Sequence, residues 1–126
     1  MHYPPLWRFR LLRALKAKGS SENRRLLGAW ATAEGGSARY NPLNTTQPWL
    51  GASNYNHVGV KNYPSAKAGI AATAATLTNG YYNGIVTCLR HGRWPAEHVV
   101  KSYAGEFDTW GTGWRHVLAV LEQQKT

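Results

Sequence analysis

Cysteine is almost absent from the sequence: Cys88 is the only one, which excludes an intrachain disulfide and a cysteine-based metal site. No apolar run approaches the roughly 20 residues that a membrane-spanning helix requires, so we expect no membrane span. The five histidines show no HExxH or comparable metal-ligand spacing, and no glycine-rich phosphate loop or GxSxG nucleophile motif is present. These absences predict a protein that uses neither a metal nor a cofactor.

Acidic residues are also scarce. Six Asp and Glu against 15 Lys and Arg give a net charge of +9 at pH 7. This excess favours an anionic partner, which is nucleic acid, a membrane surface or a cell-wall polymer, although a soluble basic domain without such a partner has the same composition.

The carboxylates are unevenly spaced along the chain. Residues 35–96, a run of 62, contain none. Glu22 precedes Glu34 by twelve residues on one expected helix, about 18 Å along its axis. If Glu34 works with a second carboxylate, the remaining candidates are Glu97, Glu106, Asp108 and Glu122.

A length of 126 residues and a hydrophobic content of 43% are typical of one folded domain over residues 1–126. We expect a helical entry over residues 1–36, a polar aromatic lobe over 37–64 and a helical core over 65–126. The lobe is rich in Asn, Pro, Gly, Thr and Tyr, which predicts turns and at most short strands. A segment of this kind longer than about 15 residues is usually functional.

Helix signals recur on both sides of the lobe. The first helix is expected to end at Gly19 and to bury Leu6, Phe9, Leu12 and Leu15. Ser20 or Ser21 is placed to cap a second helix that ends at Glu34, before Gly35 and Gly36. Ser65 is placed to cap a helix over 66–77, and others are expected over 81–91, 95–103 and 114–121, with a loop over 105–113. The fold class is mainly α, with about six short helices around one core and a small irregular or β lobe after the second helix.

Glu34 is the best-supported candidate for a catalytic residue. It stands at the carboxyl end of a helix, where the helix dipole disfavours a second negative charge, and Trp30 lies one turn earlier. Both the dipole and partial burial raise a carboxyl pKa. A carboxylic acid that stays protonated near neutral pH is what a general acid needs, although position alone also fits an exposed glutamate without a role.

Aromatic residues are abundant, with six Trp and seven Tyr. Those that fall in or beside expected loops lie near Asn and Thr side chains, a combination that suits the flat faces and hydroxyl groups of sugars. Single-stranded bases stack on the same kind of surface. The alternative to ligand binding is burial in the core, which we expect for the tryptophans on the apolar faces of the expected helices.

Residues 30–46, WATAEGGSARYNPLNTT, resemble the catalytic signature of small lysozyme-like domains found in endolysins and tail proteins of phages that infect actinobacteria. The resemblance continues through residues 54–65, NYNHVGVKNYPS, and ends at Trp110-Gly111-Thr112-Gly113. The sequence is also similar, more distantly, to lytic transglycosylases, goose-type lysozymes and flagellar-type glucosaminidases. The resemblance implies a lysozyme-like fold and cleavage of peptidoglycan glycan strands, with the helix-end glutamate, here Glu34, as general acid.

The carboxylate spacing bears on the implied mechanism. Two-carboxylate glycosidases hold their partners about 5 Å apart when retaining and about 6.5–9.5 Å apart when inverting. The lobe after Glu34 contains no such partner. Either the 2-acetamido group of the sugar assists, as in lytic transglycosylases that form a 1,6-anhydro product, or Asp108 or Glu106 folds back to activate water.

Other side chains are candidates for substrate binding. Asn44, Thr45 and Thr46 are candidates to bind acetamido or hydroxyl groups. Tyr63 or Tyr82 is a candidate to orient Glu34 or to hydrogen-bond the intermediate. Tyr55 and Trp110 are candidates to stack on sugar rings.

The expected partners are peptidoglycan and anionic cell-wall polymers, not nucleic acid, and a monomer is expected. The alternatives are an inactive lysozyme-fold domain that binds the wall or builds a phage tail, and a basic nucleic-acid-binding module. Residues 1–18 do not read as a secretory signal, so we expect release through a holin-type route or carriage on a virion.

Overall fold

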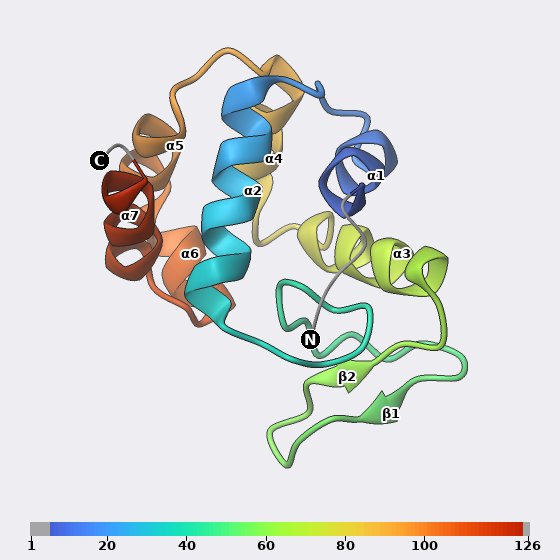
Figure 1. Ribbon diagram of the computed structural model, residues 1–126. Helices are drawn as coiled ribbons and strands as arrows, with labels where there is room; N and C mark the ends of the chain where they lie inside the picture. The colour runs from blue at the N-terminus through green and yellow to red at the C-terminus, as the bar shows by residue number, and fades with distance from the viewer. Residues whose placement is uncertain (1–5, 125–126) are drawn as a thin grey trace.

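The computed structural model describes residues 6–124 and contains seven helices and one two-stranded sheet within that range (Figure 1). The helices are α1 (Trp7–Ala14), α2 (Ser21–Glu34), α3 (Ala66–Leu77), α4 (Asn83–His91), α5 (Ala96–Ser102), α6 (Ala104–Trp110) and α7 (Trp114–Gln123). The strands β1 (Ser53–Asn54) and β2 (Lys61–Asn62) pair antiparallel. The expected mainly α fold with a small β lobe after the second helix is confirmed. In the described part of the chain no helix has the length and apolar character needed to cross a lipid bilayer.

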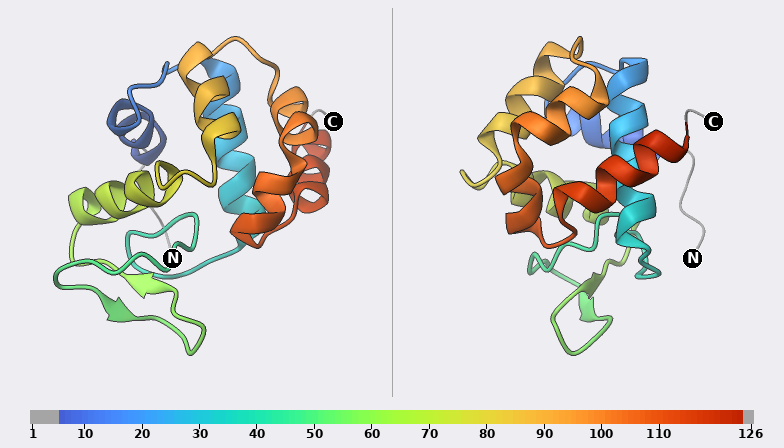
Figure 2. Two further views of the ribbon diagram at one scale, coloured as in Figure 1. Left: turned by 180° about the vertical axis from the view of Figure 1, so that it is seen from behind. Right: turned by 90° about the vertical axis from the view of Figure 1, so that its left-hand side faces the viewer.

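Helix α2 is bounded by the two local signals that the sequence predicts. Ser20 Oγ accepts a hydrogen bond from the Asn23 N–H at 3.2 Å, which caps the first turn. Gly35 ends the helix in the left-handed conformation with φ 61°, and its N–H donates to the Ala31 carbonyl. Glu34 is therefore the last helical residue. Figures 1 and 2 show α2 between α1 on one side and α5, α6 and α7 on the other.

The core explains why the expected loop over residues 105–113 is mostly helix. Phe107 on α6 is fully buried, and its ring meets that of Trp30 edge to face with 4.8 Å between centroids. Burial of this ring holds residues 104–110 in a helix despite the glycines nearby, and only Gly111–Gly113 remains as a loop. Tertiary packing thus adds a helix that local sequence signals do not predict.

Helix α1 also differs from the expectation. It ends at Ala14 instead of reaching Gly19, and two residues expected to be buried, Phe9 and the N-cap residue Leu6, are exposed. The buried positions at this end of the chain are Leu11, Leu12 and Leu15. The Arg24 guanidinium lies 5.0 Å from the centroid of the Phe9 ring, a cation–π contact that accounts for an aromatic residue at the surface. Helix α4 likewise begins after the two tyrosines expected to open it.

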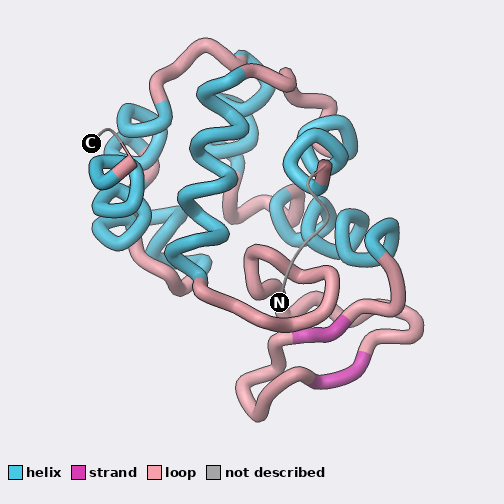
Figure 3. The backbone as a smooth tube through the Cα atoms, viewed as in Figure 1, coloured by secondary structure: helices cyan, strands magenta, loops and turns pink. Residues whose placement is uncertain are grey.

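The lobe, residues 37–64, is almost all loop (Figure 3). The buried Asn41 side chain holds it together: Nδ2 donates to the carbonyls of Thr45 and Lys61, each at 2.8 Å, and Oδ1 accepts from the Thr45 N–H at 2.9 Å. Thr45 Oγ1 also lies 2.7 Å from Thr76 Oγ1 on α3. Because these bonds satisfy backbone groups that a sheet would otherwise pair, the lobe keeps a defined shape next to the carboxyl end of α2 (Figure 1).

Candidate active site

Glu34 is half-buried at the point where α2 meets the lobe. Burial disfavours its charged form and raises the pKa of the carboxyl group from 4.5 to about 7. The Asn44 side chain and, to a smaller extent, the Trp30 indole lower the pKa of Glu34 and so limit this rise. A carboxyl group with a pKa near 7 exists in both protonation states at neutral pH, so it is able to give up a proton and to take one back.

Asn44 is the direct partner of Glu34. Its Nδ2 donates to Glu34 Oε1 at 3.2 Å and to the Glu34 carbonyl at 3.3 Å. The Asn44 backbone has φ 59°, a left-handed conformation that asparagine tolerates better than most residues. A Cβ at Gly36 would lie 2.1 Å from Asn44 Oδ1, so Asn44 has room only because residue 36 has no side chain.

Three buried polar atoms of this cluster have no hydrogen-bond partner in the described structure: Glu34 Oε2, Asn44 Oδ1 and Trp30 Nε1. Trp30 lies one helical turn before Glu34 on the same face of α2, and its indole N–H lowers the carboxyl pKa without forming an aligned hydrogen bond. Buried polar atoms are normally paired, so three unpaired ones around the same carboxyl group mark this cluster as a candidate functional site.

Aromatic rings pack behind the cluster. Trp110, the last residue of α6, meets Trp30 and Tyr82 edge to face, each with 5.1 Å between centroids. Its Nε1 donates to the Leu43 carbonyl at 2.8 Å, one residue before Asn44. Tyr82 is buried, and burial together with nearby Glu106 raises the pKa of its hydroxyl group. These rings thereby tie α6 to the lobe at the base of the Glu34 site.

The remaining candidates for substrate binding divide between the interior and the surface of the lobe. Thr45 is buried, and its hydroxyl group contacts Thr76 and accepts from the Gln47 N–H at 3.2 Å. Tyr63 is buried, its hydroxyl donates to the Gln47 carbonyl at 2.7 Å, and burial raises its pKa to about 12. Thr46 and Tyr55 are exposed. In this structure Thr45 and Tyr63 therefore hold the lobe, and the other two present their side chains to solvent.

Both candidates for a second carboxylate bind the backbone at the start of a helix. Glu106 accepts from the Ile85 N–H with Oε1 at 2.9 Å and from the Gly84 N–H with Oε2 at 3.0 Å. Asp108 Oδ1 accepts from the Trp114 N–H at 3.2 Å. A carboxylate at a helix amino end satisfies unpaired N–H groups and interacts favourably with the dipole. Glu106 thus caps α4, and Asp108 caps α7.

Sequence reasoning missed the part that Gly36 and Asn41 play at this site. The first makes space for Asn44, and the second fixes the loop that carries it. A turn rich in Asn and Gly directly after a helix-end glutamate is the only local signal for either residue. The contacts themselves depend on how residues 36–45 fold back.

Comparisons with protein-family models, with curated proteins and with solved structures give no match for this chain.

Proposed function

We propose that this protein cleaves the glycan strands of bacterial peptidoglycan, with Glu34 as the general acid. The observation that carries the proposal is the Glu34 carboxyl group, which has a pKa of about 7 and one buried oxygen, Oε2, without a protein partner. In this proposal the Glu34 carboxyl group carries the proton that is transferred to a glycosidic oxygen. The mainly helical fold, with this glutamate at a helix end facing a polar lobe, agrees with the lysozyme-like resemblance of residues 30–46.

The mechanism uses one protein carboxyl group. Glu34 gives its proton to the glycosidic oxygen while the bond from that oxygen to C1 breaks, and positive charge develops on C1 and the ring oxygen. The oxygen of the substrate's own 2-acetamido group stabilises this charge. The two-residue alternative has less support because Glu106 and Asp108 are already engaged as helix caps.

Glu34, now a carboxylate, completes the reaction by accepting the proton of the attacking hydroxyl group. If the 6-hydroxyl of muramic acid attacks C1, the product is a 1,6-anhydro ring; if water attacks, the product is a reducing end. Asn44 holds the carboxylate through Oε1 during this step. The site of action is the cell wall, reached through a holin-type route or on a virion.

Mass spectrometry of soluble fragments released from purified peptidoglycan tests the proposal. Wild-type protein is expected to release disaccharide-containing fragments, and Glu34→Gln none, because an amide cannot protonate a leaving group. Glu122→Gln, which changes an exposed carboxyl group on α7, is the matched control and should keep full activity. Fragments from Glu34→Gln at the wild-type rate, or none from the wild-type protein, would contradict the proposal.

The same spectra separate the two products. A 1,6-anhydromuramic acid terminus identifies a lytic transglycosylase. A reducing terminus identifies a hydrolase, and the sugar at that terminus distinguishes a muramidase from a glucosaminidase.

A further inference from the structure

A pocket of about 440 Å³ lies at the opposite end of α2 from Glu34. Its lining residues are Lys18, Ser20, Arg90, His91, Gly92 and Arg93. They come from two segments that are distant in sequence: the connection between α1 and α2, and the end of α4 with the connection that follows it. Figures 1 and 2 show these connections at the same end of the molecule, away from the lobe. We call this pocket the basic cradle.

The basic cradle has a fixed backbone. Asn23 is buried, and its Nδ2 donates to the carbonyls of Lys18 at 2.8 Å and Leu89 at 2.7 Å. The Lys18 N–H donates to the same Leu89 carbonyl at 3.3 Å, and Arg90 Nε donates to the Leu15 carbonyl at 3.0 Å. These bonds join the α1–α2 connection to the end of α4, so the backbone that carries the cationic side chains is fixed.

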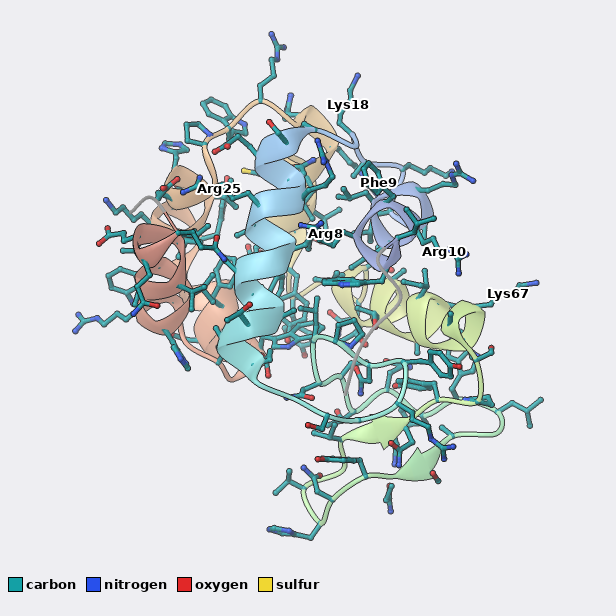
Figure 4. All side chains as sticks on the ribbon, in the orientation of Figure 1. Arg8, Phe9, Arg10, Lys18, Arg25 and Lys67 are labelled. Carbon is teal, nitrogen blue, oxygen red and sulfur yellow. The ribbon has the colours of Figure 1, made fainter. Side chains whose placement is uncertain are left out.

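Gly92 allows the two connections to approach each other. Its φ is 75°, and a Cβ at this position would lie 2.5 Å from the Lys18 Cβ. The stem of Lys18 therefore passes directly over the Gly92 backbone. Figure 4 shows the rest of the Lys18 side chain extending outward from this end of the protein.

Charge at the basic cradle is uncompensated. No carboxylate is among its lining residues in the described structure. The neighbouring acidic residues Glu22 and Glu97 are instead paired with Arg25, which contacts both carboxylates. Lys18, Arg90 and Arg93 are thus gathered around one hollow without a counter-charge, and a cleft lined by one sign of charge concentrates ions of the other sign.

Two further pockets are lined in part by cationic residues of the same region. One, of about 470 Å³, shares His91 and Arg93 with the basic cradle and adds Trp94. The other, of about 360 Å³, adds Arg13 and Lys16 and ends at Gly19, next to Lys18 in the chain. Three cationic pockets in one region suit an extended polyanion better than a single small ion.

We propose that the basic cradle and its two flanking pockets bind the phosphate groups of a phosphodiester-bearing cell-wall polysaccharide. The inference rests on the proposed function for its setting, since such polymers accompany peptidoglycan. Arginine guanidinium groups contact phosphate oxygens in pairs, and lysine adds a mobile point charge. The fourteen residues of α2 separate the basic cradle from Glu34 by about 20 Å, so a bound polymer leaves the active site free.

A nucleic acid carries the same phosphodiester groups but fits these pockets less well. Single-stranded nucleic-acid sites stack successive bases on open aromatic faces. The two rings in the flanking pockets are already covered on one face: His98 stacks on Trp94, and Arg24 lies over Phe9. Each ring thus has at most one face left for a base, which limits stacking of successive bases at these pockets.

The experiment measures binding of the Glu34→Gln protein, which is used so that the wall is not degraded. The ligand is purified cell wall that retains its phosphate polymers, compared with wall from which phosphodiesters have been stripped by acid. Lys18→Gln with Arg93→Gln removes two charges from the basic cradle without touching Arg90, whose side chain holds the backbone. Lys67→Gln with Lys101→Gln is the control pair, because it removes the same charge from exposed positions on α3 and α5.

The basic-cradle pair is expected to weaken binding to intact wall about tenfold or more and to lower the salt dependence by about two ion equivalents, one per lost phosphate contact. The control pair should weaken binding by less than about threefold, since it changes only the long-range electrostatic field of the protein. Stripped wall should bind all the variants equally weakly. With Glu34 restored, the basic-cradle pair should cleave short soluble glycan fragments at the wild-type rate.

Four results would overturn the inference. Equal losses for the two pairs would mean that net charge alone drives binding, and undiminished binding to stripped wall would mean that phosphate is not recognised. Inorganic phosphate that competes as well as the polymer would mean a single-ion site. A single-stranded DNA oligonucleotide bound more tightly than wall, through the same lysine and arginine, would mean a nucleic-acid surface. Since binding is read in Glu34→Gln, a failure of glycan cleavage would be seen separately.

Discussion

Asn44 holds the carboxyl group of Glu34 from a left-handed turn ten residues further along the chain. One side-chain amide contacts both the carbonyl that ends α2 and the carboxyl oxygen of the same residue. Helix end, lobe and proposed acid are therefore fixed relative to one another by a single residue. We interpret Asn44 as a positioning residue, in place of the expected contact with the acetamido group of the substrate.

Replacing Asn44 by glycine tests this role. Glycine accepts the left-handed backbone, so Asn44→Gly removes the amide with little strain. We expect kcat to fall about tenfold or more, because a misplaced acid loses its alignment. The high-pH limb of the kcat/KM profile should move to higher pH, because the bond from Asn44 lowers the pKa of Glu34. An unchanged limb with a normal melting temperature would show that Asn44 does not act on the carboxyl group.

The pH dependence of the wild-type protein follows from Glu34. A general acid must be protonated, so kcat/KM should fall as pH rises through about 7. A profile with no decline between about pH 6 and about pH 8, one unit either side of that pKa, would exclude Glu34 as the acid.

Stability should follow the same titration. The folded pKa of Glu34 lies above the unfolded value of 4.5, so its favourable contribution is complete below pH 4.5 and is lost as pH rises through about 7. Glu34→Gln should therefore raise the free energy of unfolding more at pH 8 than at pH 4, by about 1–2 kcal/mol after allowance for solvent screening. Denaturant unfolding at the two pH values measures the difference, and a larger gain at pH 4 would contradict the expected sign.

Gly36 and Gly105 form a matched pair for alanine substitution. A methyl group at residue 36 meets the Asn44 side chain, whereas nothing lies within 4 Å of a Cβ at residue 105. Gly36→Ala should lower activity as much as Asn44→Gly does, and the double variant should lose little more, because both changes remove the same contact. Gly105→Ala, on the exposed face of α6, should keep activity and gain about 0.5–1 kcal/mol of stability. Additive losses in the double variant would mean that the two residues act separately.

Substitution of Glu106 distinguishes the one-carboxylate mechanism from the alternative with two carboxylates. Its carboxylate caps α4 through Gly84 and Ile85, so Glu106→Ala should cost about 1–2 kcal/mol of stability. Activity measured well below the melting temperature should stay within about threefold of wild type, because the proposed chemistry does not use this group. A loss of several hundredfold with a reducing-end product would instead identify Glu106 as a base, and Asp108→Ala gives the same test for the second candidate.

Local signals predicted the elements that carry the site. Ser20 and Ser65 cap helices at the expected places, and Gly35 ends α2 where it was expected to end. Each of these signals acts within one helical turn, so a single sequence contains everything that decides them. The same reasoning missed α6, because what stabilises that helix is the contact between Phe107 and Trp30, 77 positions apart in the sequence.

The candidate site likewise has features that the sequence predicts and contacts that it does not. From residue order alone it follows that a glutamate ends the second helix, that no carboxylate follows for 62 residues and that a polar aromatic lobe comes next. The folded chain is needed to see that Asn44 is the partner of Glu34, that Glu106 caps α4 and that Lys18 lies against Gly92. Caps and helix ends form between neighbours in the chain, whereas these contacts exist because the core brings distant segments together.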